Sequence, residues 1–134
     1  MNAQQPHCRA SWDVTVQVLA SDSAQLSEEF GITVGRWTQY TATGDLPFGA
    51  MWCVVPPGGH SNIDQHPDRE LFIVVQGSGE VQVPGGPARP APAGTAVLMD
   101  AQEPHVLVNR SEDRPLVALS LYWIPEGRSG SDAR

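Results

Sequence analysis

The stretch that decides the fold is residues 58–77, GGHSNIDQHPDRELFIVVQG. Its second half, from Glu70 to Gln76, is β-branched and aromatic throughout, which predicts a strand. Asp64 and His66 are two residues apart, so on an extended backbone both side chains point to the same face. Glu70 opens the apolar strand directly after a Pro-Asp-Arg corner, which would fold its carboxylate back towards that pair. The stretch therefore joins a buried strand to three side chains that can bind a metal.

Short apolar runs separated by turns continue on both sides of this stretch. The 13 glycines and 12 prolines of the chain supply the turns, and no helical period is sustained. A helical turn is expected only at 21–30, where Ser27-Glu28-Glu29 suits a helix start. Proline excludes 87–93 from the centre of a sheet. The expected strands are 12–19, 32–41, 49–55, 70–76, 80–83, 95–99, 105–109 and 115–124, which predicts an all-β sandwich or barrel.

Length and charge limit the possible classes of function. The 134 residues suffice for one domain, with a flexible arm at 1–10, a barrel domain at 11–125 and a disordered tail at 126–134. A net charge of −7 without a basic cluster argues against nucleic acid and anionic membranes. The start of the chain shows no signal-peptide pattern, and Cys8 and Cys53 form no disulfide framework, so a cytoplasmic location is expected.

Two spaced patterns resemble the motifs of the cupin family. The first motif, a glycine, two histidines, a glutamate and a second glycine, is matched by Gly58, Asp64, His66, Glu70 and Gly77, with Asp64 at the place of the first histidine. The second motif is matched by Gly94, His105 and Asn109, while Asp100 and Gln102 replace its proline and second glycine. The resemblance implies a single double-stranded β-helix, the cupin or jelly-roll barrel.

The resemblance also implies a metal site and its ligands. It assigns His66, Glu70 and His105 as ligands, with Asp64 as the fourth. Two imidazoles and two carboxylates suit one divalent ion, such as zinc, iron, manganese, nickel or cobalt. Four protein ligands on an octahedral ion would leave two positions for substrate, oxygen or water.

Other interpretations of these residues stay open at this point. Both histidines can be structural, Asp64 can be a turn residue, and Glu70 can pair with Arg69 or Arg36. Some cupins that lose motif residues also lose the metal, so the barrel can be empty. Asn109 is expected to fix a turn or to bond a neighbouring strand. The aromatic residues Tyr40, Trp52, Tyr122 and Trp123 line either a pocket or the core.

The resemblance predicts an enzyme that acts on a small organic molecule in a natural-product pathway. The metal would act as a Lewis acid, and Glu70, His60 or Tyr40 would move a proton, giving isomerisation, elimination or cyclisation. Iron would instead permit dioxygenase chemistry. The alternatives are a non-catalytic binding module, or an accessory subunit of a larger enzyme, such as a synthetase-like partner in N–N bond formation. A homodimer that pairs through the N-terminal strand is expected.

Overall fold

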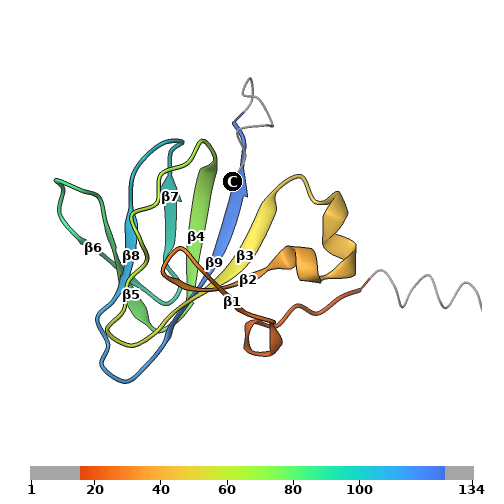
Figure 1. Cartoon of the computed structure of the whole chain (residues 1–134), viewed down its shortest axis with the longest axis horizontal. Helices are drawn as coiled ribbons and strands as arrows, with labels where there is room; N and C mark the ends of the chain where they lie inside the picture. The colour runs from red at the N-terminus through yellow and green to blue at the C-terminus, as the bar shows by residue number, and fades with distance from the viewer. Residues whose placement is uncertain (1–15, 126–134) are drawn as a thin grey trace, which may run out of the picture.

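The computed structural model describes residues 16–125, so the expected arm at 1–10 and tail at 126–134 lie outside the described residues. Within this range the chain forms strands and three short 3-10 helices (Figure 1). The helices are η1 (Ser21–Ser23), η2 (Trp37–Gln39) and η3 (Thr41–Asp45). The strands are β1 (Ser27–Glu29), β2 (Ile32–Arg36), β3 (Gly49–Val55), β4 (Arg69–Gln76), β5 (Ser78–Gln82), β6 (Arg89–Pro92), β7 (Ala96–Met99), β8 (Val106–Asn109) and β9 (Leu116–Trp123).

Two antiparallel sheets form the barrel. The larger has the strand order β1-β2-β3-β9-β4-β7, and the smaller has the order β6-β5-β8. The segment before β4 lies alongside β8 (Figure 1), and isolated β-bridges pair His60 with Val108 and Asp64 with His105. The all-β jelly-roll class predicted from the sequence is confirmed.

The barrel interior is apolar along most of its length and polar at one end. Alternate residues of the strands point inwards, so Met51 and Cys53 of β3 belong to the core cluster inside the barrel, while Trp52 between them is buried on the other face. In the polar part of the interior, Glu70 and Ser120 are fully buried on the adjacent strands β4 and β9. Buried polar groups need partners, and these lead to the site described below.

The N-terminal part of the chain differs from the prediction. Residues 16–20 form no strand, and Val16 and Val18 are 70% and 89% exposed. A short helical turn does form within 21–30, as η1, but the helix start predicted at Ser27 is wrong, because these residues form β1. A two-residue turn at Phe30 and Gly31, with φ of 59° and 78°, joins β1 to β2 and thereby makes a tight hairpin.

The remaining strands follow the prediction closely. β3 has the predicted bounds, but the strand expected at 32–41 ends at Arg36 and continues as η2 and η3. The proline-rich segment forms β6, which pairs only with β5 and lies at the edge of its sheet. Asn109 acts as predicted, because its Nδ2 donates to the carbonyl oxygens of Val55, Pro56 and Arg114.

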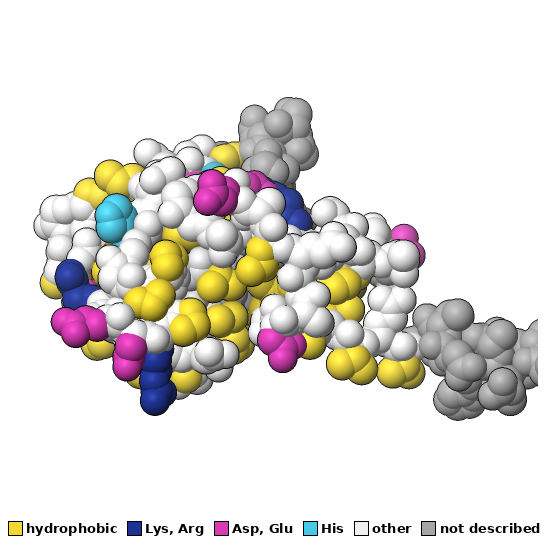
Figure 2. All heavy atoms as spheres, turned by 60° about the horizontal axis from the view of Figure 1, so that its bottom comes forward, with side chains coloured by type: hydrophobic (Ala, Val, Ile, Leu, Met, Phe, Trp, Pro, Cys, Tyr) yellow, Lys and Arg dark blue, Asp and Glu magenta, His cyan; other side chains and the backbone are white. Residues whose placement is uncertain are grey.

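Hydrophobic side chains also reach the surface. Ile63 is 67% exposed and Leu98 is 57% exposed. On the face shown in Figure 2, hydrophobic side chains gather in the middle, and charged side chains lie mostly towards the border. No helix among residues 16–125 is long and apolar enough to cross a membrane.

Candidate metal centre

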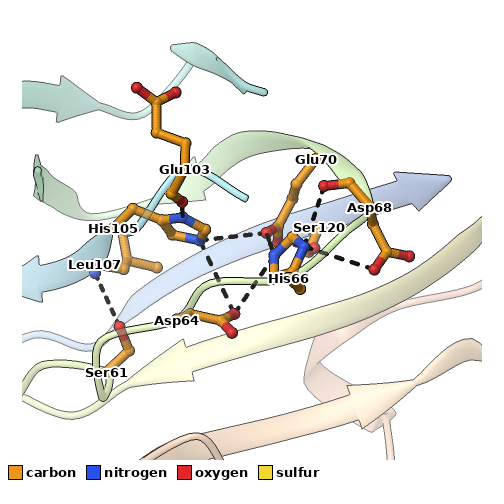
Figure 3. Close-up of polar contacts among 9 residues, drawn as sticks. All are labelled: Ser61, Asp64, His66, Asp68, Glu70, Glu103, His105, Leu107 and Ser120. Atoms are coloured by element: carbon orange, nitrogen blue, oxygen red, sulfur yellow. Dashed lines mark hydrogen bonds and ion pairs between the residues drawn. The ribbon is translucent and has the colours of Figure 1, made fainter. Parts of the chain in front are cut away.

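The four residues assigned as ligands converge from three parts of the fold (Figure 3). Asp64 and His66 lie on the segment between β3 and β4, Glu70 is the second residue of β4, and His105 directly precedes β8. The amide of Asp64 donates to the carbonyl oxygen of His105 at 2.9 Å, and the amide of His105 donates back at 3.0 Å. This pair of backbone hydrogen bonds holds Asp64 and His105 directly opposite each other.

The separations between the potential ligand atoms suit a common ion. Oε1 of Glu70 lies 2.9 Å from Nε2 of His66 and 3.4 Å from Nε2 of His105, and Oδ2 of Asp64 lies 3.7 and 3.9 Å from the same nitrogens. Metal–ligand bonds of about 2.1 Å place neighbouring ligand atoms roughly 3.0–3.4 Å apart in octahedral or tetrahedral geometry. Glu70 and the histidines already fit this range, and Asp64 needs only a small movement.

Both imidazoles are oriented so that Nε2 faces the cluster. Nδ1 of His66 lies 3.1 Å from the carbonyl oxygen of Asp68, and Nδ1 of His105 lies 2.8 Å from that of Glu103. A carbonyl oxygen only accepts, so each Nδ1 carries a proton, and Nε2 is the ring atom that can offer a lone pair to a cation. Nε2 of His105 is buried and makes no hydrogen bond within residues 16–125. A bound cation would satisfy this atom, so the residues present fit a metal.

Ser120 positions the carboxylate of Glu70, and the sequence analysis missed it. Its hydroxyl donates a short hydrogen bond to Oε2 of Glu70, which leaves Oε1 towards the histidines (Figure 3). Both residues have no exposed surface. The available signal was a serine at an inward position of the otherwise apolar strand β9. The proposed pairing of Glu70 with Arg69 or Arg36 is wrong, because Arg69 pairs with Asp100 and Arg36 with Glu29.

Asp68 is a second residue that the sequence analysis did not single out. It is 1% exposed, and its Oδ1 lies 3.6 Å from Nδ1 of His66 (Figure 3). Its backbone oxygen and its carboxylate therefore both face the same imidazole. No sequence pattern distinguished Asp68 from the other polar residues of this corner.

Burial and neighbouring charges act in opposite directions on His105. Burial lowers the pKa of its imidazole, but the Glu70 carboxylate, the Glu103 carbonyl and the Asp64 carboxylate outweigh it, and the pKa ends above its usual value. Without a cation, His105 therefore holds a proton more firmly than an ordinary histidine. A metal ion would compete with this proton for Nε2.

The structure does not bring His60 or Tyr40, both predicted as proton carriers, to the cluster. His60 is exposed, and its Nδ1 lies 2.8 Å from the carbonyl oxygen of Ser61. The Tyr40 hydroxyl accepts from Nε1 of Trp52, which is on the face of β3 opposite to the core. Among the four aromatics, Tyr122 packs against the core, whereas Trp52 and Trp123 occupy outward positions of their strands.

A small cavity adjoins the cluster. Its volume of about 10 Å³ is close to that of one water molecule. Asp64 and His105 line it on the polar side, and Phe30, Met51 and Cys53 are among its apolar lining. Asp64 is 17% exposed, whereas Glu70 is fully buried and does not line the cavity. A ligand larger than water therefore requires the apolar side of the cavity to move.

Known proteins resemble the chain in both sequence and fold. The family model of the cupin domain matches residues 51–122. Dimethylsulfoniopropionate lyase DddQ of Ruegeria pomeroyi is 29% identical over 119 residues, which cover 84% of this chain and 54% of that protein, so the chain spans about half the length of this relative. A Cupin 2 conserved barrel domain protein from Salinispora arenicola is 26% identical with a TM-score of 0.71, covering 82% of this chain and 90% of the other. The polyketide cyclase RemF from Streptomyces resistomycificus is 19% identical with a TM-score of 0.66, covering 80% and 78%, and shares the fold alone.

Proposed function

Because the chain belongs to the cupin family, we propose that it is a metal-dependent enzyme that acts on a small organic molecule. The observation that carries the proposal is the buried set of two imidazoles and two carboxylates, with Nε2 of His105 left without a hydrogen bond inside it. When bound there, a divalent ion would polarise a carbonyl or carboxylate oxygen as a Lewis acid, and iron would add dioxygen chemistry. The word lyase in the name of the 29% identical relative supports an elimination as the reaction.

We assign different roles to the two carboxylates. Glu70 is fully buried and held by Ser120, so it serves to hold the ion and does not reach the substrate. Asp64 lines the cavity and its carboxylate lies farther from the imidazoles, so it is the carboxylate placed to accept a proton from a bound molecule. Such a transfer is one way to start an isomerisation, an elimination or a cyclisation. The finer assignment to a natural-product pathway rests on the resemblance to small cupins.

A second candidate is a non-catalytic module that binds only the metal. The water-sized cavity favours it, because the cavity that Asp64 and His105 line holds about 10 Å³. The two candidates differ in whether a position on the ion exchanges with added ligands. An exchangeable water that a small carboxylate displaces would support the enzyme, and a closed coordination sphere would support the module.

We also propose a cytoplasmic homodimer. β1 is a three-residue edge strand, and Val16, Val18 and Leu26, which precede it in the sequence, are exposed. Edge strands and exposed apolar side chains are commonly covered by a second chain. Light scattering coupled to size-exclusion chromatography tests this: a monomeric mass at micromolar concentration would contradict it.

The first experiment is elemental analysis of the protein purified without added metal or a nickel column. We expect about one metal ion per chain in the wild type, loss in His105→Ala, and retention in His60→Ala, which removes an exposed histidine outside the cluster. Iron in the purified protein would favour redox chemistry, and zinc would favour Lewis-acid chemistry. A wild type that carries no metal and also takes up no zinc, manganese or iron(II) would contradict the proposed function.

Asp64→Ala decides the role of the fourth carboxylate. If Asp64 only accepts a proton, the variant keeps its metal and loses turnover. If Asp64 is a ligand, metal affinity falls as well. Metal titration and binding of a small carboxylate are therefore measured on the same preparation.

A further inference from the structure

We propose that Arg36 and Tyr122 form an anion-binding site on the inner wall of the barrel, which holds a carboxylate of the substrate beside the metal centre. The inference rests on the proposed function for the role of the metal, and it names the substrate class: a small organic acid with a second oxygen group that reaches the cluster. Arg36 is a positive charge inside the barrel, Tyr122 binds it, its guanidinium has unused donors, and Phe30 connects it to the cavity beside the metal centre.

Arg36 is the basic residue that faces the barrel interior. It continues the inward positions of β2 after Ile32 and Val34, and in the register it lies beside the core residue Met51. The sequence contains no lysine, and the other arginines between residues 16 and 125 are on the outside. Arg69 occupies an outward position of β4 and pairs with Asp100, Arg110 pairs with Glu80 at the surface, and Arg89 and Arg114 are exposed.

Tyr122 reaches Arg36 because Gly49 leaves room for its ring. A Cβ atom at Gly49 would lie 2.6 Å from Cζ of Tyr122, so the ring passes directly over this residue of β3. The Tyr122 hydroxyl then accepts from Nη1 of Arg36 at 3.0 Å. In the register, Tyr122 is the direct partner of Glu70 on β4. A single side chain thus extends from the strand next to the metal ligand, across β3, to the arginine on β2.

The guanidinium of Arg36 keeps donors for a further acceptor. Nε and Nη2 bind the Glu29 carboxylate side-on at distances between 2.7 and 3.2 Å, and Nη1 binds Tyr122. Arginine has five N–H groups, so one hydrogen on each of Nη1 and Nη2 is not used by these contacts. These two hydrogens suit a carboxylate, and the side chain is 31% exposed.

Phe30 places this site next to the cavity. Its ring centroid lies 5.9 Å from Cζ of Arg36, and the same residue lines the cavity together with Asp64 and His105. The Phe30 ring is therefore shared between the guanidinium and the cavity beside the metal centre. Gly49 and Glu70 flank Tyr122 on the neighbouring strands, two strand spacings or roughly 10 Å apart. Arg36 lies one strand beyond Gly49, on β2, and its guanidinium reaches back to the Tyr122 hydroxyl, so a short organic acid that bridges the guanidinium and the cluster needs the Phe30 ring to move aside.

Substitutions of Glu29 and of Arg36 should change anion affinity in opposite directions, which gives the proposal a test. The Glu29 carboxylate partly neutralises Arg36, so replacement of Glu29 by glutamine leaves more positive charge for a bound anion. Replacement of Arg36 by glutamine removes the charge. If the pair were only structural, both substitutions would act in the same direction.

The experiment measures binding of succinate and of its half-amide, succinamate, to the manganese-loaded protein by calorimetry. We expect the wild type to prefer succinate, R36Q to weaken succinate binding roughly tenfold to a hundredfold, and E29Q to tighten it. R36K keeps the charge and should lie between wild type and R36Q, and Y122F should weaken binding less than R36Q does. R110Q, which removes a surface arginine with a similar acidic partner, should bind as the wild type does.

Metal content and circular dichroism of each variant separate the possible failures. A folded R36Q that keeps its manganese and binds succinate as the wild type does would overturn the inference and leave the proposed function intact. A wild type that does not bind succinate at millimolar concentration would also overturn it. If instead the protein takes up no metal, but succinate still binds and requires Arg36, the anion site is supported and the proposed function fails.

Discussion

Replacement of Ser120 by alanine isolates the contribution of a residue that touches a metal ligand without being one. The Ser120 hydroxyl donates to Oε2 of Glu70, and both side chains have no exposed surface. Water cannot easily replace the donor at this depth. In Ser120→Ala the carboxylate loses the hydrogen bond and gains freedom to rotate, so Oε1 is no longer held 2.9 Å from Nε2 of His66.

The substitution should lower both the stability of the fold and the affinity for metal, and each can be estimated. An unsatisfied buried acceptor costs about 1–3 kcal/mol, and a charged one lies towards the upper end. Loss of a residue that orients a metal ligand typically lowers metal affinity by about 10- to 100-fold, which corresponds to about 1.4–2.7 kcal/mol. For a chain of this length, 1 kcal/mol shifts the melting temperature by about 4 °C. The variant without metal should therefore melt about 4–12 °C lower than the wild type without metal.

The assay is competition for zinc against a chelator of known affinity, combined with thermal unfolding in the presence and absence of zinc. The matched control is Ser61→Ala, because Ser61 is also buried and its Oγ accepts from the Leu107 amide at 2.9 Å without touching the ligands. We expect Ser61→Ala to lower stability but to leave zinc affinity within about twofold, since no ligand loses a contact. Equal zinc affinities for Ser120→Ala and the wild type would refute the reasoning.

Three further predictions concern neighbouring features. Gly49→Ala should lower the free energy of unfolding by about 1–3 kcal/mol, because the new methyl group overlaps the Tyr122 ring; an unchanged denaturation midpoint would contradict that packing. Metal binding should release protons and weaken below neutral pH, because the raised pKa of His105 means that a cation must displace a proton; calorimetry in buffers of different ionisation enthalpy measures the release, and none would contradict the cluster geometry. Phe30→Ala should speed metal removal by a chelator, because its ring lines the cavity; equal rates for wild type and variant would place the route elsewhere.

The strands could be predicted where pattern and turn residues agree. Residues 49–55 are apolar, end at two prolines and form β3 with the predicted bounds. The failures are at the N-terminus, where local preference and pairing disagree. Ser27 and the two glutamates after it favour a helix start in isolation, but the Phe30-Gly31 turn pairs them with β2. Turn geometry that depends on a phenylalanine at positive φ cannot be recognised from composition.

The candidate site was predictable only in part. Spacing and resemblance identified the four residues that the fold gathers, because motif spacing encodes which residues share a barrel face. Ser120 was missed because it follows Glu70 by 50 residues, and only the strand register brings it alongside. Tyr40 was selected for its chemistry alone, yet the chain leaves the sheet after Arg36 and the side chain packs on the outer face against Trp52. A polar residue at an inward position of an apolar strand was the better indicator.

The position of β9 has a consequence for the order in which the protein can mature. β9 is the last strand among residues 16–125, yet it lies between β3 and β4 and pairs with both over their length. Until residues 116–123 leave the ribosome, the two halves of the large sheet have no strand to join them. Ser120, which holds Glu70, arrives with that strand. Metal loading should therefore follow release of the complete chain, and a product that stops before residue 116 should neither close the barrel nor retain the ion.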